Sequence, residues 1–424
     1  MSKHSFHVPQ SAKDNSAALL KWIIFAVLVG LSVGVAGSAF HLVLDKATEL
    51  RLIHPWLLYC LPAAGLLIVA AYRFSGMSDD TGTERVLFSI KSGRPMRLRT
   101  APLIFLATSL THLCGGSAGR EGAALQLGGS ISSGLGKLLS LEEEDERIIT
   151  MCGMAAGFSA LFGTPLAASV FAMEVANVGV MYYAAIVPCV LAALLAQQVA
   201  QFFGLHTHVF TVTNVPVMDV NSIISVILLG ILCGILAFFF CLIMHLGGKL
   251  YKKVTPDPWV RVVLGGVIVV VFSLLLGTRD YNGAGMDVIT RAVEGEAAPL
   301  AFLIKILLTS LTLNAGYKGG EIVPSFFVGA TFGCVVGPLL GLSPSFAAAV
   351  SMIAVFCGVT NSPMTAILLG YELFVGVGVA PMALVSAISY VTSGTSGLYH
   401  LQTITHSKTR PEYTRLVSED AKTL

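Results

Sequence analysis

Two interruptions in apolar sequence decide the fold: residues 115–123 read GGSAGREGA, and residues 316–324 read GYKGGEIVP. Each separates two apolar runs, and each carries one glutamate, Glu121 in the first and Glu321 in the second. In a membrane, non-helical backbone is tolerated only where protein buries it or where it lines a cavity. We therefore expect discontinuous helices at these two places, and we expect the function of the chain to be located there.

The composition places the whole chain in a membrane. Of its 424 residues, 55% are hydrophobic and only 12% are charged, and the mean hydropathy is +0.79. A soluble domain carries roughly 25% charged residues, so a soluble enzyme, a nucleic-acid binder, a disordered scaffold and a coiled coil are all excluded. At ~20 apolar residues per crossing, around ten or more membrane segments fit. We predict an all-α polytopic membrane protein.

The distribution of basic residues predicts the orientation. Lysine and arginine gather in both terminal stretches and in the loops around 85–99 and 249–261, which the positive-inside tendency places in the cytoplasm. We expect a cytoplasmic segment 1–18, a single transmembrane domain 19–400 and a cytoplasmic tail 401–424. The short loops and the absence of a regulatory domain favour a bacterial inner membrane.

The chain also repeats itself. Residues 103–111, LIFLATSLT, match 304–312, IKILLTSLT, and the glutamates that follow are 200 positions apart. Further on, 154–174 matches 352–372 in the same order. Repeated halves that meet at a midplane site are a transporter design, and their relation is inverted if an odd number of crossings separates equivalent segments. The repeat halves span about 19–204 and 219–400.

The chemistry at the breaks favours anions. Glu121 and Glu321 each begin an apolar run, so each is expected at a helix N-terminus, where free N–H groups and the helix dipole favour negative charge. A bound anion or a glutamate side chain can occupy such a site. The main-chain donors we expect are the N–H groups of Arg120, Gly122, Ala123, Ile322 and Val323. The alternative is that each glutamate is a plain helix cap, but ionisable groups within a bilayer are functional candidates by default.

These residues resemble the CLC family of anion channels and proton-coupled antiporters. Residues 119–123, GREGA, resemble the family motif G-K/R-E-G-P, and residues 319–324, GGEIVP, resemble G-x-F-x-P. The segment 162–174 and the tyrosine segment 393–399 also match, so the resemblance covers roughly residues 20–400. It implies inverted repeats with broken and re-entrant helices, and a homodimer with one anion pathway per subunit.

The resemblance also implies roles for two side chains. Glu121 is the gating glutamate, which alternately fills the anion site and carries a proton. Tyr399 matches the pore tyrosine, a hydroxyl donor at the inner end of the site; the alternative is a tyrosine of the membrane-interface belt. Arg120 is either part of the anion site or a plain ion-pair partner of Glu121.

Four departures from the family pattern point to one branch. The stretch 79–84, DDTGTE, lacks the serine and proline of G-S-G-I-P, and either Thr81 or Thr83 stands in for that serine. Ala123 replaces the proline after the gate, Val175 takes the place of a second acid, and Glu321 replaces an apolar residue. This set resembles the fluoride-exporting branch of bacterial CLC antiporters.

The chemistry of fluoride supports that branch. Fluoride accepts strong hydrogen bonds, and a protonated carboxyl donates one, whereas an ionised carboxylate repels an anion. Burial and the like charge of Glu121 both disfavour the ionised form of Glu321. The sequence thus predicts a proton-coupled antiporter that exports fluoride, with Glu121 for gating and proton transfer. The anion-binding residues expected are Thr83, Arg120, Gly122, Glu321, Ile322, Val323 and Tyr399.

Three alternatives compete with this prediction. A chloride/proton exchanger and a passive chloride channel keep the same fold. An intramembrane enzyme with a Glu121–Glu321 pair is disfavoured, because the sequence holds no nucleophile motif, metal triad or cofactor loop; no cofactor and no metal are expected. His112 is interpreted as a polar residue packed between helices, and Glu174 and Glu372 as structural acids at the periphery of the bundle.

Overall fold

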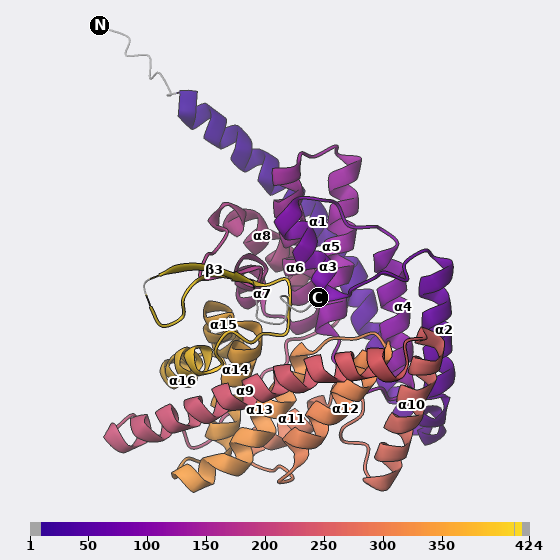
Figure 1. Cartoon of the computed structure of the whole chain (residues 1–424). Helices are drawn as coiled ribbons and strands as arrows, with labels where there is room; N and C mark the ends of the chain where they lie inside the picture. Colours follow the sequence, from indigo (N-terminus) through magenta and orange to yellow (C-terminus); the bar gives the residue numbers. More distant parts are fainter. Residues whose placement is uncertain (1–9, 411, 418–424) are drawn as a thin grey trace, which may run out of the picture.

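The computed structural model of the chain describes residues 10–410 and 412–417. The predicted cytoplasmic segment 1–18 therefore lies outside the described residues up to position 9, and the tail 401–424 lies outside them at 411 and from 418 onward. The described part contains sixteen α-helices, which form two sets of eight in the same order. Figure 1 separates the sets by colour, with α9–α14 in the lower part of the view.

The first set is α1 (Gln10–Ile53), α2 (Leu61–Phe74), α3 (Thr83–Ser92), α4 (Thr100–Leu113), α5 (Glu121–Leu138), α6 (Glu143–Phe162), α7 (Pro165–Glu174) and α8 (Ile186–Phe202). The second set is α9 (Val220–Val254), α10 (Pro258–Leu275), α11 (Met286–Glu294), α12 (Ala301–Ala315), α13 (Ile322–Val336), α14 (Pro344–Thr360), α15 (Pro363–Leu373) and α16 (Val379–Thr392). Three 3-10 helices occur between them: η1 (Pro55–Cys60), η2 (Tyr183–Ala185) and η3 (Gly337–Leu340).

The two sets meet at the glycine-rich breaks. The main chains of Gly119 and Gly320 form an antiparallel bridge of two hydrogen bonds. Around it, the Ser117 N–H donates to Thr312 Oγ1 at 3.1 Å, and the Lys318 N–H donates to Thr111 Oγ1 at 3.3 Å. Equivalent residues that contact each other reciprocally and run in opposite directions are related by a local two-fold axis. The two halves are thus related by a two-fold axis that passes between the breaks, as the predicted inverted repeat requires.

The longer repeat match is a pair of broken helices. The sequence reads as continuous apolar runs over 148–174 and 345–371, but the structure breaks each in two. Gly163 and Asn361 adopt left-handed conformations, with φ of 70° and 56°, and end α6 and α14. A proline then begins α7 and α15, because its fixed φ suits the first helical turn.

Glu174 and Glu372 cap the helices that follow these breaks, each in the opposite half. Glu174 accepts the N–H groups of Met364 and Thr365 at the start of α15, at 3.0 and 2.9 Å. Glu372 accepts those of Leu166 and Ala167 at the start of α7, both at 2.9 Å. The two acids are structural in this geometry, but Glu174 is buried, so its expected place at the periphery is wrong.

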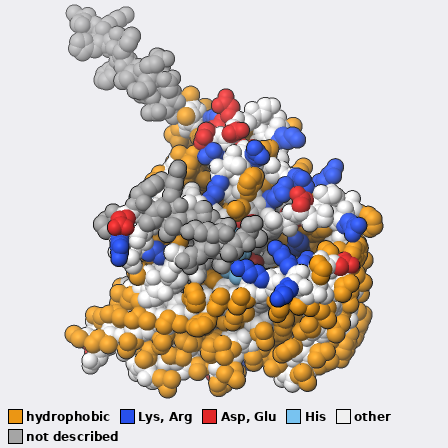
Figure 2. Space-filling model, viewed as in Figure 1, with side chains coloured by type: hydrophobic (Ala, Val, Ile, Leu, Met, Phe, Trp, Pro, Cys, Tyr) orange, Lys and Arg blue, Asp and Glu red, His pale blue; other side chains and the backbone are white. Residues whose placement is uncertain are grey.

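The outer surface is suited to lipid. Six helices among the described residues are long and apolar enough to cross a membrane, including α1, α9 and α10, and shorter apolar helices accompany them. Large apolar side chains are exposed along α1, α9 and α10. Figure 2 shows apolar side chains covering the lower part of one face, with charged side chains gathered above them. An apolar exterior with polar groups at one edge is the pattern expected of a multi-pass membrane protein.

A small sheet, which the sequence analysis does not predict, lies beside the bundle. It consists of β1 (Asn177–Val178), β2 (Thr403–His406) and β3 (Tyr413–Val417), in the order β1-β2-β3. The pairing of β1 with β2 is parallel, and that of β2 with β3 is antiparallel. The sheet ties the chain after α16 to the segment after α7, and so restrains the loop that carries Tyr399.

Candidate functional site

The Glu121 carboxylate lies where the two glycine-rich breaks meet. Its side chain is fully buried at the first position of α5. Its Oε2 accepts the N–H of Arg120 at 2.9 Å and the N–H of Val323, in the first turn of α13, at 3.3 Å. Its Oε1 has no hydrogen-bond partner among the described residues. One carboxylate therefore receives donors from the N-terminal ends of two helices, one from each half of the chain.

This arrangement is an anion site that a side chain fills. The first N–H groups of a helix have no partner within that helix, and the helix dipole adds positive potential there. Charge-assisted hydrogen bonds to a carboxylate satisfy both. Two of the predicted main-chain donors, those of Arg120 and Val323, make these bonds. Gly122 and Ile322 are buried in the same two helical turns.

The glycines are required because the backbones approach closely. A Cβ on Gly119 would lie 2.5 Å from the Oε2 atom of Glu121 and 3.0 Å from the main-chain oxygen of Gly320. A Cβ on Gly320 would lie 2.5 Å from the main-chain nitrogen of Gly122. Real Cβ atoms do not approach other atoms this closely, so any side chain here separates the two breaks.

A cavity of about 560 Å³ leads to one side of the site. Thr83, Gln126 and Glu321 line it near the breaks. Four basic side chains also line it: Arg73, Lys252, Arg261 and Lys318. Clustered cations raise the local concentration of small anions, so the cavity is suited to an anion that approaches the breaks.

Glu321 lies at the N-cap position of α13, but its side chain accepts no capping hydrogen bond. It faces the cavity instead, and Glu84 and Glu121 are its acidic electrostatic neighbours. The Glu321 side chain therefore does not act as a helix cap in this structure.

The two candidate threonines differ in their position. Thr83 is buried, and its Oγ1 atom lies 2.9 Å from where a Cβ on Gly122 would be, which places the hydroxyl beside the start of α5. Thr81 also lines the cavity but is exposed. Of the two, only Thr83 lies against the glycine-rich break.

Tyr399 is buried, which excludes a tyrosine of the membrane-interface belt. Its hydroxyl has no hydrogen-bond partner in the described part of the chain. Glu321, Glu84 and Glu121 are its acidic electrostatic neighbours. A buried hydroxyl without a partner is costly, and an anion between Tyr399 and the breaks would satisfy it.

The Arg120 guanidinium turns away from the carboxylate beside it. Its Nη1 donates to Asp45 at 2.9 Å, while its Nε lies 4.0 Å from Glu121 Oε1, at the limit of an ion pair. The main chain of Arg120, rather than its side chain, holds Glu121. The His112 ring is buried, with Nε2 3.2 Å from the Gly119 main-chain oxygen, in agreement with a polar group packed between helices.

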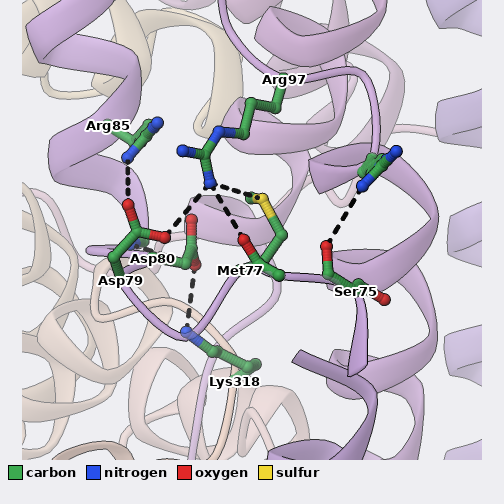
Figure 3. A network of polar contacts seen from close by, with 10 residues as sticks. Ser75, Met77, Asp79, Asp80, Arg85, Arg97 and Lys318 are labelled. Carbon is green, nitrogen blue, oxygen red and sulfur yellow. Dashed lines mark hydrogen bonds and ion pairs between the residues drawn. The ribbon is translucent and has the colours of Figure 1, made fainter. Parts of the chain in front are cut away.

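An ion-pair network at the cavity was not expected from the sequence. Lys318 Nζ donates to Asp80 at 3.1 Å and lies 4.3 Å from the centre of the Tyr72 ring. Figure 3 shows Lys318 directed at Asp80, and Asp79 between Arg85 and Arg97. The Asp80 side chain is 1% exposed, so this aspartate is a buried charge. No local signal in the sequence pairs the two aspartates before Thr81 with the lysine three residues before Glu321.

Three further polar residues near the site were also missed. Gln126, one turn into α5, has a buried Oε1 without a partner among the described residues. Lys305 of α12 is fully buried and donates to the main-chain oxygens of Tyr281 and Gly283 at 3.1 and 2.7 Å. Glu84 follows Thr83 directly. Each is a single polar residue in a helix, which no spacing distinguishes from a solvated or packing residue.

The comparisons with known proteins agree with this geometry. Residues 65–394 match the family described as voltage gated chloride channel. A chloride/fluoride channel protein of Pseudomonas syringae pv. tomato is 38% identical over 92% of this chain and 88% of its own length. An H⁺/Cl⁻ exchange transporter of Vibrio cholerae is 27% identical over 83% of this chain and 81% of its own length. Among solved structures, a CLC-type fluoride/proton antiporter superposes with a TM-score of 0.86 at 29% identity, covering 93% of this chain and 99% of that one.

Proposed function

Because the chain belongs to the voltage-gated chloride channel (CLC) family, we propose that it is a proton-coupled anion antiporter that exports fluoride in exchange for protons. One observation carries the proposal: the buried Glu121 carboxylate accepts main-chain N–H groups from both α5 and α13. A group that is held in this way competes directly with an anion for the same donors.

The proposed exchange follows from the charge of Glu121. While ionised, its carboxylate takes the donors of Arg120 and Val323 and keeps anions out. Protonation removes the charge and weakens both hydrogen bonds, because bonds to a neutral acceptor are roughly half as strong. The side chain then leaves the site and an anion takes its place. The return of Glu121 requires loss of the proton and displacement of the anion, which couples the two movements.

Fluoride is the proposed anion because of Glu321. This side chain faces the cavity, and a protonated Glu321 carboxyl would donate a hydrogen bond to the anion. Fluoride is the halide that gains most from a strong O–H donor. The Tyr399 hydroxyl and Thr83 are the other side-chain donors that we propose. The relatives named above as a chloride/fluoride channel protein and a fluoride/proton antiporter support this choice.

A chloride/proton exchanger or a passive chloride channel remains the second candidate, and the similarity to an H⁺/Cl⁻ exchange transporter favours it. We further propose that the chain is a homodimer in a bacterial inner membrane. In this proposal, both termini lie in the cytoplasm, and residues 19–400 form one transport domain.

The deciding experiment uses the purified protein in liposomes that contain potassium fluoride or potassium chloride. Fluoride and chloride electrodes and an external pH electrode follow efflux while valinomycin clamps the membrane potential. We expect fluoride efflux with proton uptake, and much slower chloride efflux. Chloride efflux as fast as that of fluoride would refute the selectivity, and anion efflux without proton uptake would show a channel.

A further inference from the structure

Glu84 connects the first turn of α3 to the main chain that follows Tyr399. One oxygen of its carboxylate accepts the N–H of His400, and the other accepts the N–H of Leu401 at 3.0 Å. These are the two residues directly after the tyrosine. The carboxylate thus acts as a bidentate clamp on the loop, from a helix that lies more than 300 positions earlier in the sequence.

Other contacts make this clamp part of a rigid segment. At the other end of α3, Lys91 contacts the Leu401 oxygen and Thr403 Oγ1. Within the loop, the Gln402 N–H donates to the Tyr399 oxygen at 3.1 Å. Residues 399–403 are therefore held against α3 at two places, and the Glu84 contact is the one next to the tyrosine.

The same helical turn carries a second group of the site. Thr83 precedes Glu84, and its hydroxyl lies beside Gly122 at the start of α5. The first turn of α3 therefore sets the distance between the Thr83 hydroxyl and the Tyr399 hydroxyl, because one belongs to the turn and the other is clamped to it. Binding sites need their donors held within ≈ 0.5 Å by groups behind them, and a small fluoride ion permits less error than a larger halide.

We propose that Glu84 is a positioning residue for Tyr399, and that it sets the fluoride preference of the site through that tyrosine. The inference rests on the proposed function, in which the Tyr399 hydroxyl donates to the transported anion. Glu84 itself does not contact the anion in this proposal. Its contribution is to fix the loop that carries the otherwise unpartnered Tyr399 hydroxyl, and so to fix the position of that hydroxyl.

A double-mutant cycle tests the proposal. The variants Glu84→Ala, Tyr399→Phe and their combination are reconstituted, and fluoride and chloride efflux is measured over a range of anion concentrations. We expect each single variant to raise the apparent KM for fluoride by about tenfold, the effect of one lost hydrogen bond to a charged group. We also expect the ratio of fluoride to chloride efflux to fall in each single variant. The combination behaves as Tyr399→Phe alone, within about twofold, because Glu84 acts only through the hydroxyl.

Two results would overturn the inference and are distinguishable. In the first, Tyr399→Phe raises the KM for fluoride, and adding Glu84→Ala raises it further by as much as Glu84→Ala does alone. Glu84 then does not act through Tyr399, while the proposed function stands. If Tyr399→Phe leaves the fluoride KM and selectivity unchanged, the proposed donor role of Tyr399 fails, and the inference fails with it.

A milder variant guards against loss of folding. Glu84→Gln keeps one carbonyl oxygen for the loop and loses the other acceptor, so we expect a smaller rise in the fluoride KM in the same direction. Glu49→Gln is the matched control, because Glu49 is an exposed acid that pairs only with exposed Lys46 in the described structure. If Glu84→Gln leaves the KM for fluoride at the value of this control, the positioning role is refuted.

Discussion

Gly119 and Gly320 lie at equivalent positions of the two halves and hydrogen-bond each other in both directions, with N···O distances of 2.7 and 2.8 Å. This bridge brings the starts of α5 and α13 together, so that one carboxylate reaches donors from both. The position of the site therefore depends on two residues without side chains.

Replacing Gly320 by alanine should separate the two breaks. The new Cβ would lie 2.5 Å from the main-chain nitrogen of Gly122, which cannot rotate away. We expect fluoride efflux to fall at least tenfold in the liposome assay. Gly134→Ala in α5 is the matched control: there the Cβ meets only the end of the flexible Leu98 side chain, and alanine favours a helix. Normal efflux by Gly320→Ala would show that the close approach is not needed.

The Glu121→Gln variant should uncouple the two ions. Glutamine resembles the protonated glutamate, so it neither binds nor releases a proton and holds the N–H groups of Arg120 and Val323 weakly. We expect proton uptake to vanish while anion efflux continues. The measurement is external pH during fluoride efflux, and coupled proton uptake by this variant would refute the gating role of Glu121.

The Glu321→Ala variant should impair fluoride transport or its preference over chloride. Removal of the carboxyl deletes the proposed O–H donor at the cavity, and chloride depends less on that donor. Fluoride and chloride efflux rates are compared in the same preparation. The exposed acid Glu294 provides the control variant Glu294→Ala, for which no change is expected. A fluoride efflux that stays at the wild-type rate in Glu321→Ala would exclude this role.

The Asp80–Lys318 pair should affect both stability and transport. Lys318→Met leaves the buried Asp80 charge without its partner, which costs about 3 kcal/mol or more. The double variant with Asp80→Asn should recover most of that stability, because neither charge is then left alone. We expect the KM for fluoride to be raised in both Lys318→Met and the double variant, because both lack the Lys318 cation at the cavity. Thermal unfolding and efflux of the two variants separate the effect on stability from the effect on transport. Equal KM values in the double variant and the wild type would remove Lys318 from the anion pathway.

Removal of the glutamates that cap a helix of the opposite half, Glu174 and Glu372, should destabilise the fold. Glu174 accepts two main-chain N–H groups and the Thr365 hydroxyl, whereas Glu372 accepts two N–H groups and is less buried. We expect Glu174→Ala to lower the free energy of unfolding by about 2 kcal/mol or more, and Glu372→Ala by less. Unfolding temperatures in detergent measure both. An unchanged unfolding temperature in Glu174→Ala would mean that these bonds do not support α15.

Much of the architecture could be predicted from the sequence because the repeat leaves matching residues at a spacing of about 200 positions. Glycines and a glutamate 200 positions apart predicted the two breaks and their N-terminal helix ends. Val323 was among the five main-chain donors expected at the site, and the structure shows that its N–H donates to Glu121. Broken helices were expected from the family resemblance. Hydropathy alone does not locate the breaks at Gly163 and Asn361, because apolar residues continue on both sides of them.

The parts that could not be predicted are long-range polar contacts. Nothing in the local sequence around Asp80 indicates that it is buried, because its partner Lys318 lies in the other half. The same holds for Glu84, whose acceptor role appears only when the loop after Tyr399 folds back onto α3. The small sheet was missed since strands of two to five residues carry too little periodicity to be read.

The division of the Glu121 site between two halves has a consequence for biogenesis. The second main-chain donor, Val323, is translated 202 residues after the carboxylate that it binds. A nascent chain that has reached only the first eight helices therefore lacks one of the two main-chain donors that hold the Glu121 carboxylate.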